Sequence, residues 1–466
     1  MPYMSFRLPF GYFLYDRNVN KLVEIGEPEY RVISGEQRGS FETSSVMSRF
    51  HEVGFCLDNS RTEIEHPATE HLKYHLEQKV ENIVLQVTQN CNLRCAYCAY
   101  SGVYNTRTHS HKRMSLQCAK AAIDFAIQHS SEKQRLAVSF YGGEPFLEFK
   151  LIKEVVSYIE SKYPEKEIMY ATTTNGTLLT DEVVDFLVEK SFNMLFSVDG
   201  PKEVHDINRK FTSSNEGSFS VLEKKLNRIK QRYPEFYKEK CRTNTVLSPD
   251  EDYSCVKQYF ETDCLMSEIS SVFGLIRNVG RKAPIQYKQS VAFFTMQEQC
   301  KILLWMLGKI QKKNTSKLYI NFKEEIIVLY KHMKIPYKES EIMHPGGPCV
   351  PGEKKTFVDV DGNIYPCEKV SETPSMCIGD IYHEFDYEAV EKLLNVGRLT
   401  KEECKECWAF MRCTSCIAFS SDECGPSRAE RLAHCDTVKR SLYHMLETLA
   451  LLKHYRFDFE NQTQED

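Results

Sequence analysis

The sequence has no long apolar run, no excess of positive charge and no export signal near its start. A membrane-spanning helix needs about 20 consecutive apolar residues, and no stretch provides them. The net charge of −5 argues against the basic surface that nucleic-acid binding requires. Arg7, Pro9, Gly11 and Asp16 interrupt the aromatic N-terminal residues, so we expect no secretory signal. We therefore expect a cytoplasmic chain without nucleic-acid or membrane partners.

Length and composition indicate an ordinary globular protein with more than one domain. The chain has 466 residues, which exceeds the size at which a single hydrophobic core stops growing. Hydrophobic residues make up 42% and charged residues 27%, a balance typical of globular chains. We expect two or three domains, and the sequence shows no internal repeat.

Cysteine is the residue type that departs from this balance. The chain has 18 cysteines, and most of them lie within 91–98 and 349–435. A chain that is not exported keeps its thiols reduced, so clustered cysteines favour metal binding over disulfides. We expect the scattered cysteines to be small buried hydrophobic residues. They are Cys56, Cys118, Cys241, Cys255, Cys264 and Cys300.

Strand-like and helix-like segments alternate between residues 82 and 280. β-Rich composition predicts strands at 82–87, 135–143, 167–176, 193–200, 241–247 and 270–277. Helical periodicity predicts helices at 115–130, 151–163 and 181–192. This alternation predicts βαβ units around a parallel sheet. The number of strands favours an α/β fold with a partial (β/α)6 TIM-type barrel.

Unusual residues follow the ends of four of these strands. They are Cys91, the segment GGEP at 142–145, Asn175–Gly176 and Asp199–Gly200. In barrel-type α/β proteins the carboxyl ends of the strands form the rim where active sites assemble. Glycine-containing turns would explain any one of these segments, but they explain all four together poorly.

The flanking regions predict three further parts around a barrel at 81–290. Residues 1–80 contain two short strands around a turn at 16–20, and then a helix, which together predict a small α+β module. Residues 291–345 are mostly helical and bridge to a cysteine-rich domain at 346–466. This last domain includes an amphipathic helix whose apolar face we expect to pack in the core.

Cys91, Cys95 and Cys98 lie in the short motif CNLRCAYC, with the spacing C-x3-C-x2-C. Cysteine thiolates hold iron–sulfur clusters, usually four per cubane cluster, so three leave one iron without a protein ligand. That iron can bind a molecule that chelates it through an amine and a carboxylate. A zinc site would instead need a fourth ligand, and the closest candidates are His109 and His111.

The motif CNLRCAYC resembles the signature loop of radical S-adenosylmethionine (SAM) enzymes, including the aromatic residue before the third cysteine. Further segments agree in order: YGGEP at 141–145, TTNG at 173–176 and SVDG at 197–200, followed by HDINR at 205–209. The resemblance covers roughly residues 80–280 and continues into the C-terminal domain.

The resemblance implies that Cys91, Cys95 and Cys98 hold a 4Fe–4S cluster whose open iron chelates SAM. One electron, from a reductant such as flavodoxin or ferredoxin, would break the sulfur–C5′ bond and give methionine and a 5′-deoxyadenosyl radical. That radical would take a hydrogen atom from an unactivated carbon of the substrate. Cofactors carry such chemistry, whereas the protein orients it and excludes water and oxygen.

The resemblance also implies contacts with SAM along the rim. Gly142, Gly143 and Glu144 would lie against the methionyl amine, because glycine allows close backbone approach. Tyr97 would contribute through its backbone near the adenine, or its ring would simply pack.

Three more rim residues are candidates for the methionyl carboxylate and the ribose. They are Asn175, Ser197 and Arg209. An arginine suits a carboxylate because its guanidinium can bind both oxygens. For Arg209 the alternative is an ordinary surface arginine on a helix.

The second group of cysteines resembles the SPASM domain, which carries two auxiliary iron–sulfur clusters in radical enzymes that modify peptides and proteins. By the interleaving of that family, the outer cluster would bind Cys404, Cys407, Cys413 and Cys435. The inner cluster would bind Cys349, Cys367 and Cys416. Its fourth ligand would be Cys377, Cys424 or none, and an iron without a protein ligand could bind a substrate thiolate.

The SPASM pattern departs from the family at one point, because two residues instead of three separate Cys413 from Cys416. This spacing leaves open whether Cys424 replaces Cys416. A pair of zinc knuckles is the alternative for the motif C-x2-C-x5-C-x2-C. The segment TFVDVDGNIYPCE predicts a hairpin with Asp361–Gly362 as its turn and Cys367 on its return strand.

The two resemblances together imply a maturase for a ribosomally synthesised peptide, similar to enzymes of sactipeptides and ranthipeptides that form cysteine thioether crosslinks. The module at 1–80 resembles in layout the domains that bind a precursor's leader as an added strand, with a structural cap as its alternative. The alternative activities are formylglycine formation, as in anaerobic sulfatase maturation, and carbon–carbon crosslinking. A different class would be a non-catalytic electron carrier or a zinc-binding scaffold. The sequence identifies no general base.

Overall fold

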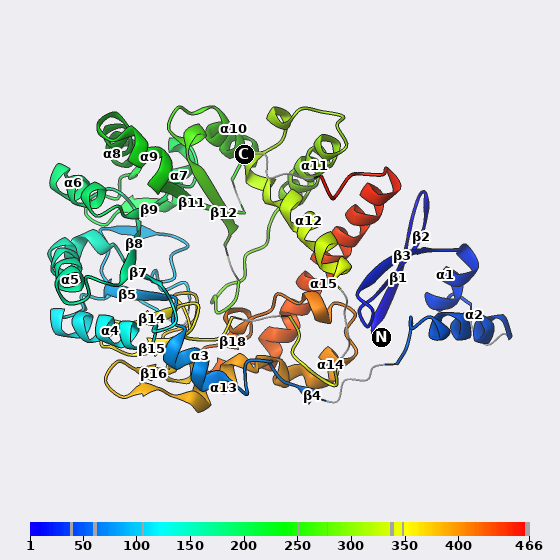
Figure 1. The fold of residues 1–466 in the computed structure, drawn as a ribbon. Helices are drawn as coiled ribbons and strands as arrows, with labels where there is room; N and C mark the ends of the chain where they lie inside the picture. Colours follow the sequence, from blue (N-terminus) through cyan, green and yellow to red (C-terminus); the bar gives the residue numbers. More distant parts are fainter. Residues whose placement is uncertain are drawn as a thin grey trace.

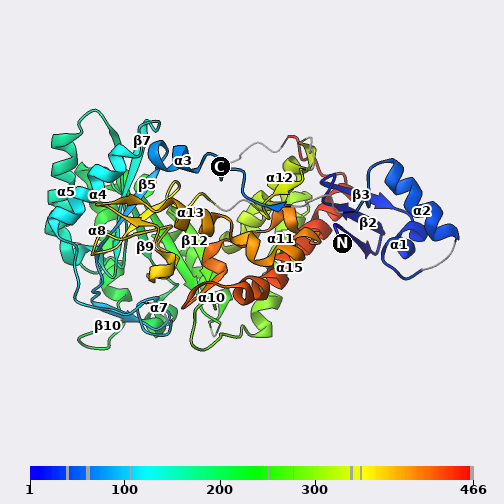
Figure 2. The same cartoon turned by 90° about the horizontal axis from the view of Figure 1, so that it is seen from below.

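The computed structural model describes residues 1–37, 41–58, 63–104, 107–249, 251–276, 278–335, 340–346 and 349–461. The molecule is elongated, with a small N-terminal module at one end and a large sheet with its helices at the other (Figures 1 and 2). The long helices α11 (Gln289–Met306), α12 (Asn321–Lys334) and α15 (Arg428–His454) lie between them. None of the helices in these ranges has the length and apolar character to cross a membrane.

The N-terminal module consists of an antiparallel sheet and two helices. Its elements are β1 (Tyr3–Leu8), β2 (Gly11–Asp16), β3 (Lys21–Ile25), α1 (Glu27–Ile33) and α2 (Phe41–Glu52). The predicted strand pair around a turn at 16–20 is confirmed, since Asp16 pairs with Lys21. The predicted helix is confirmed by α2. One face of the sheet packs on the long helices, where the ring of Phe6 meets that of Tyr443 at 5.6 Å between centroids.

The central sheet contains the six predicted strands, all parallel. They are β5 (Asn82–Thr88), β7 (Arg135–Gly142), β8 (Glu167–Thr174), β9 (Asn193–Ser197), β11 (Cys241–Leu247) and β12 (Ser270–Leu275). Within the described residues the spatial order is β12-β11-β9-β8-β7-β5, followed by two C-terminal strands. The predicted partial barrel is therefore confirmed. Residue 277, the last of the predicted strand 270–277, lies outside the described residues.

Helices cover the outer face of this sheet (Figure 1). They are α4 (Leu116–Gln128), α5 (Phe149–Lys162), α6 (Asp181–Glu189), α7 (Lys202–Asn208), α8 (Phe219–Arg232), α9 (Pro234–Lys240) and α10 (Tyr253–Thr262). The predicted helices correspond to α4, α5 and α6. Two begin at side-chain caps: Ser115 accepts a hydrogen bond from Cys118 N at 3.1 Å, and Thr180 accepts one from Val183 N at 3.3 Å.

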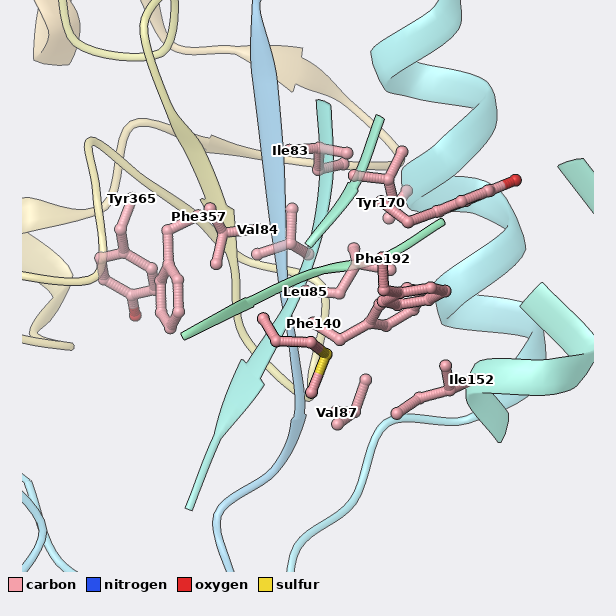
Figure 3. Packing of buried hydrophobic residues seen from close by; sticks show 14 of the residues in the cluster. Ile83, Val84, Leu85, Val87, Phe140, Ile152, Tyr170, Phe192, Phe357 and Tyr365 are labelled. Atoms are coloured by element: carbon pink, nitrogen blue, oxygen red, sulfur yellow. The ribbon is translucent and has the colours of Figure 1, made fainter. Parts of the chain in front are cut away.

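A hairpin from the C-terminal half extends the barrel sheet. Its strands are β14 (Thr356–Val358), parallel to β5, and β15 (Ile364–Tyr365), antiparallel to β14. The predicted turn is confirmed, because Gly362 has a φ of +94°. The prediction for Cys367 is wrong, since β15 ends at Tyr365 and Cys367 lies beyond it. Figure 3 shows Phe357 and Tyr365 of the hairpin packed beside Val84 of β5.

The remaining elements are short and lie in the barrel region or the C-terminal half. They are β4 (Glu63–Ile64), α3 (Leu72–Gln78), β6 (Leu93–Cys95), β10 (Arg209–Phe211), β13 (Ile342–Met343), β16 (Gly379–Asp380), β17 (Glu384–Phe385), α13 (Tyr387–Leu394), α14 (Lys401–Lys405), β18 (Ser421–Asp422) and β19 (Gly425–Pro426). Leu72 and Leu76 of α3 belong to the main core, so the last part of the range 1–80 packs with the barrel.

The scattered cysteines are only partly buried. Cys56, Cys118 and Cys241 are buried as predicted, and Cys255 is half-buried. The prediction is wrong for Cys264 and Cys300, which are exposed. Cys264 lies just after α10, and Cys300 lies on a face of α11 that contacts solvent.

Candidate active site at the barrel rim

The loop that follows β5 carries Cys91, Cys95 and Cys98. Its middle forms β6, which pairs with β10 so that Cys95 lies opposite Arg209. The Cys98 N–H donates to the carbonyl oxygen of Cys95 at 3.1 Å, which turns the chain between them. Backbone and guanidinium donors face the three sulfurs: Leu93 N lies 3.4 Å from Cys91 Sγ, Tyr100 N lies 3.4 Å from Cys98 Sγ, and Arg209 Nη1 lies 3.9 Å from Cys95 Sγ.

These donors favour thiolates, whereas burial favours thiols. Burial, with Glu144 as the next cause, raises the pKa of Cys91 to about 12, and burial raises that of Cys95 to about 11. The charges of Cys95 and Cys98 also act on Cys91, so the three sulfurs lie near one another. A metal centre would displace their protons. In the described ranges no three His, Cys, Asp or Glu side chains lie close enough to bind a single metal ion. An iron–sulfur cluster does not require this, because each of its thiolates binds a separate iron.

The GGEP segment packs directly on the backbone of the cysteine loop. Gly143 N donates to the Thr88 carbonyl oxygen at 2.9 Å, and Glu144 N donates to that of Asn90 at 2.9 Å. A Cβ added at Gly143 would lie 2.1 Å from the Asn90 carbonyl oxygen, and one at Gly142 would lie 2.1 Å from that of Thr88. Both glycines are therefore required by the close approach of this loop.

Glu144 connects the GGEP segment to the TTNG segment. Its carboxylate is fully buried and accepts hydrogen bonds from Asn175 N at 2.8 Å, Thr174 Oγ1 at 2.7 Å and Phe146 N at 3.2 Å. Burial raises its pKa to about 7. Asn175 Nδ2 in turn donates to Asn92 Oδ1 in the cysteine loop at 2.9 Å. The structure thus brings three of the four predicted rim segments into mutual contact.

The fourth rim segment enters through Asp199, which we placed at the rim without predicting a role for its side chain. Its buried carboxylate accepts hydrogen bonds from Arg209 Nε at 2.8 Å and Nη2 at 3.1 Å, and from the Tyr97 hydroxyl. Burial alone would raise the pKa of Asp199, but the Arg209 guanidinium holds it below its usual value. One sequence signal could have revealed this pair: the aspartate of SVDG, at a strand end, lies ten residues before the arginine of HDINR.

The geometry decides between the alternatives for Arg209 and adds a contact for Tyr97. Arg209 is only 6% exposed, so it is not a surface arginine; it binds Asp199 and faces Cys95. Tyr97 donates its hydroxyl to Asp199, so its ring is held by a hydrogen bond as well as by packing. Ser197 lies half-buried at the end of β9, beside Asn244 of β11.

The C-terminal cysteines fall into two groups. Four of them line one pocket of about 230 Å³ between α14 and α15: Cys404, Cys407, Cys413 and Cys435. Three others lie elsewhere, near one another. Burial raises the pKa of Cys367 to about 11, and the nearby Glu368, Cys349 and Cys416 add to the rise. These groups have the same members as the predicted outer and inner sets.

Cys377 and Cys424, the two candidates for a fourth inner ligand, have different surroundings. The Cys377 thiol donates to the Gly379 carbonyl oxygen at 3.2 Å and lines a different cavity, of about 740 Å³. Cys424 is exposed in the turn between β18 and β19. The predicted zinc candidate His109 stacks on Tyr100 and binds the carbonyl oxygen of Gln89 at 3.3 Å through Nδ1.

A cavity of about 320 Å³, here called the central cavity, lies between the cysteine loop and the C-terminal half. Tyr97 and Ala99 line it from the loop, Val246 and Ile276 from the barrel, and residues 368–371 from the chain just after Cys367; Ala418, two residues after Cys416, also contributes. Tyr141 and Glu368 line both this space and a second one of about 480 Å³ inside the sheet, here called the barrel cavity. The two cavities therefore share part of their lining.

Comparison with known proteins agrees with this geometry. Residues 85–262 match the family described as "Radical SAM superfamily". The chain carries a radical SAM domain. This domain contains β5 through α10, the cysteine loop and every rim segment described above.

Several curated proteins are similar to the radical SAM domain or to more of the chain. A cysteine-type anaerobic sulfatase-maturating enzyme of Clostridium perfringens is 23% identical over 369 residues, which are 77% of this chain and 94% of that protein. The radical SAM cyclopropyl synthase TigE of Paramaledivibacter caminithermalis is 27% identical over 195 residues, 39% of each chain. An uncharacterized protein of Methanocaldococcus jannaschii is 32% identical over 143 residues, 31% of this chain and 46% of that protein. The matches to these last two span less than half of their length.

A solved structure shows the same fold over most of the chain. "Native anSMEcpe with bound AdoMet" superposes with a TM-score of 0.59 at 19% identity, covering 80% of this chain and 99% of that one. The same protein, "with bound AdoMet and Kp18Cys peptide", gives a TM-score of 0.58. The partial barrel with its cysteine-rich C-terminal half is therefore a known architecture.

Proposed function

We propose that the chain is a radical SAM enzyme that modifies a ribosomally synthesised precursor peptide at cysteine. The observation that carries this proposal is the position of the central cavity. The cavity has the predicted SAM-binding cysteine loop on one side and the residues after Cys367 and Cys416 on the other. A substrate in it would lie between a radical source and an electron acceptor.

The residues present fit the implied cofactors. Three clustered thiols, each facing an N–H donor, suit a 4Fe–4S cluster with one iron open to SAM. Such a cluster and SAM supply, when bound, a carbon radical that removes a hydrogen atom. The chain itself positions the loop through Glu144 and Asn175 and holds the Cys95 side through the buried Asp199–Arg209 pair.

The auxiliary sites fit two further clusters. The outer pocket has four cysteines and suits a fully ligated cluster. The inner group has three; the Cys377 thiol donates to the Gly379 carbonyl oxygen, and Cys424 is exposed. A cysteine of the peptide could bind the remaining iron as a thiolate. This arrangement supports thioether formation: a peptide S–H and a C–H bond are lost and an S–C bond forms. One hydrogen would leave as an atom to the adenosyl carbon and the other as a proton, and clusters held by the auxiliary cysteines would take up the remaining electron.

A second candidate is sulfatase maturation, the formation of formylglycine on a protein. It is favoured by the match to 94% of the Clostridium perfringens sulfatase-maturating enzyme. In either activity a reductant such as flavodoxin or ferredoxin would supply electrons. For a precursor peptide, the antiparallel sheet of the N-terminal module would offer an edge for its leader.

The test is the reductive cleavage of SAM by anaerobically reconstituted protein. Wild-type protein should form 5′-deoxyadenosine, and a variant with Cys91, Cys95 and Cys98 all changed to Ala should form none. The exposed Cys300→Ala is the matched control and should behave as wild type. A zinc scaffold or a non-catalytic electron carrier would consume no SAM with either protein. With candidate precursors, a mass loss of two hydrogens per crosslink supports thioether formation, whereas formylglycine would overturn it.

A further inference from the structure

Strand β12 is the terminal strand of the barrel sheet. It pairs with β11 along one edge, from Arg242 opposite Ser270 to Leu247 opposite Leu275. In the described part of the chain the sheet order ends at β12, and Figure 1 shows the strand at this end of the sheet. The turn Lys317–Tyr319 lies near its beginning, where Lys317 Nζ donates to the Ser267 carbonyl oxygen at 2.7 Å. An open strand edge is a template for pairing with another extended chain.

Strand β12 borders both cavities. Val272 lines the barrel cavity, and Leu275 at the end of the strand and Ile276 just after it line the central cavity. Gly274 lies between them along the strand and pairs with Val246, which also lines the central cavity. Because side chains alternate along a strand, position 274 faces the same side as Val272. Val272 is 52% exposed, so this face is open to an incoming molecule.

Nothing within the chain requires a glycine at 274. A Cβ added there would meet no atom within 4 Å, and the backbone does not adopt a positive φ. Glycine inside a strand weakens it, and often marks a site where another backbone approaches closely. The fold therefore gives no reason for the open space at Gly274, which lies along the strand between residues that line the two cavities, and an occupant would account for it.

We propose that an extended segment of the peptide substrate lies alongside β12, with its main chain bonded to the open edge and passing over Gly274. This inference rests on the proposed function, since it takes the occupant to be the substrate. The edge leads into the central cavity, so a peptide held there would bring its next residues between the two cysteine groups. Main-chain bonding supplies affinity with little dependence on sequence, and specificity comes from the cavities.

Hydrogen–deuterium exchange of reconstituted full-length protein tests this docking without requiring turnover. The probe is a pool of short synthetic peptides, each with one central cysteine between mixed residues. Amides of 270–275 should exchange at least about fivefold more slowly with the pool than without it. Gly274→Leu, whose side chain would fill the open space, should abolish the slowing, and Gly274→Ala should reduce it. Ser270→Leu, on the same strand but outside both cavities, should keep it.

Absence of slowing in the wild type, or equal slowing in Gly274→Leu, would overturn the inference. Thermal unfolding of each variant identifies any loss of fold, and the Ala variant tests the site if the Leu variant unfolds. Formation of 5′-deoxyadenosine by the wild type without peptide is measured in parallel. Failure of that reaction would refute the proposed function, whereas the exchange result reports on peptide docking alone.

Discussion

Asp199 holds together three side chains of the rim, although its role is not visible in any motif taken alone. It binds Arg209 and Tyr97, and it also accepts a hydrogen bond from Val246 N at 3.1 Å. Arg209 in turn faces Cys95, so the carboxylate supports the cysteine loop through a buried cation. A buried ion pair is costly to break because the remaining charge stays unsolvated.

Asp199→Asn should therefore destabilise the protein by about 3–5 kcal/mol, since it leaves the Arg209 guanidinium without a counter-charge. The variant should also bind less iron at the cysteine loop. Urea unfolding and iron analysis measure the two effects. Asp181→Asn, which breaks largely exposed pairs with Arg228 and Arg232, is the control and should cost below about 1 kcal/mol. Equal effects of the two substitutions would contradict this account.

His344 makes the stability of the protein depend on pH. Burial, and then the charges of Arg431, His66 and Arg398, lower its pKa to about 3, from an ordinary 6.5. Its Nε2 accepts a hydrogen bond from Gly397 N at 2.9 Å. Between these two pKa values the unfolded chain binds the proton and the folded chain does not, so the stabilisation is complete above pH 6.5 and is lost as the pH falls.

The wild type should lose about 2 kcal/mol of unfolding free energy between about pH 7.5 and about pH 5 through His344. His344→Gln retains an acceptor for Gly397 but does not titrate. The unfolding free energy of the variant should therefore fall by about 2 kcal/mol less than that of the wild type over this range. Urea unfolding at both pH values measures the difference. Parallel pH profiles for the two proteins would show that His344 is not responsible.

At the residue scale the sequence motifs predicted which side chains gather at the rim but not how they pair. The spacing of CNLRCAYC placed three cysteines on one loop, and the strand ends placed GGEP and TTNG beside it. The bond between Asp199 and Arg209 depends on the turn that α7 makes between them. Side-chain pairing across such a turn has no periodic signal, so the alternatives for Arg209 stayed open.

At the element scale, the contact between the end of β7 and the cysteine loop leaves no room for a side chain. Gly143→Ala would force a Cβ against the Asn90 carbonyl oxygen and push the loop away. We expect a loss of about 1–3 kcal/mol in stability, as for other overpacked sites, and a lower iron content. Gly274→Ala is the matched control, because its Cβ meets open space. Unchanged iron content in Gly143→Ala would contradict the predicted role of this contact.

The elements themselves were predicted well where one periodicity dominated. The βαβ strands and the helices with capped starts at Ser115 and Thr180 are in place. The hairpin β14–β15 was predicted from its turn, but its parallel pairing with β5 was not. Local sequence specifies a turn through glycine, whereas the choice of a distant partner strand depends on the packing of side chains such as Phe357 against the main core.

At the scale of the whole molecule, Arg17 links the N-terminal module to the outer cysteine pocket. It is fully buried and donates to the carbonyl oxygens of Cys404 at 3.3 Å, Cys407 at 2.7 Å and Lys405. The side chain therefore fixes the loop that carries two of the four outer cysteines. The module is held against the cysteine-rich half by this contact as well as by apolar packing on the long helices.

Arg17→Lys should keep the charge but lose the planar set of donors, because an ammonium cannot reach three carbonyl groups in the same way. We expect a destabilisation of about 1–3 kcal/mol and the loss of iron from the outer site, with the cysteine-loop cluster retained. Calorimetry and iron analysis with electron paramagnetic resonance would measure both. Arg7→Lys, at an exposed position of the same module, should behave as wild type.

The pairing of β14 with β5 determines how late in synthesis the barrel sheet can be completed. Thr356 pairs with Ile83, a partner more than half the chain's length away. During synthesis on the ribosome, one edge of β5, the strand before the cysteine loop, therefore stays unpaired until most of the polypeptide has emerged. Such distant pairing is slow to form. Iron delivery to the nascent chain would come too early, so loading is expected to follow release.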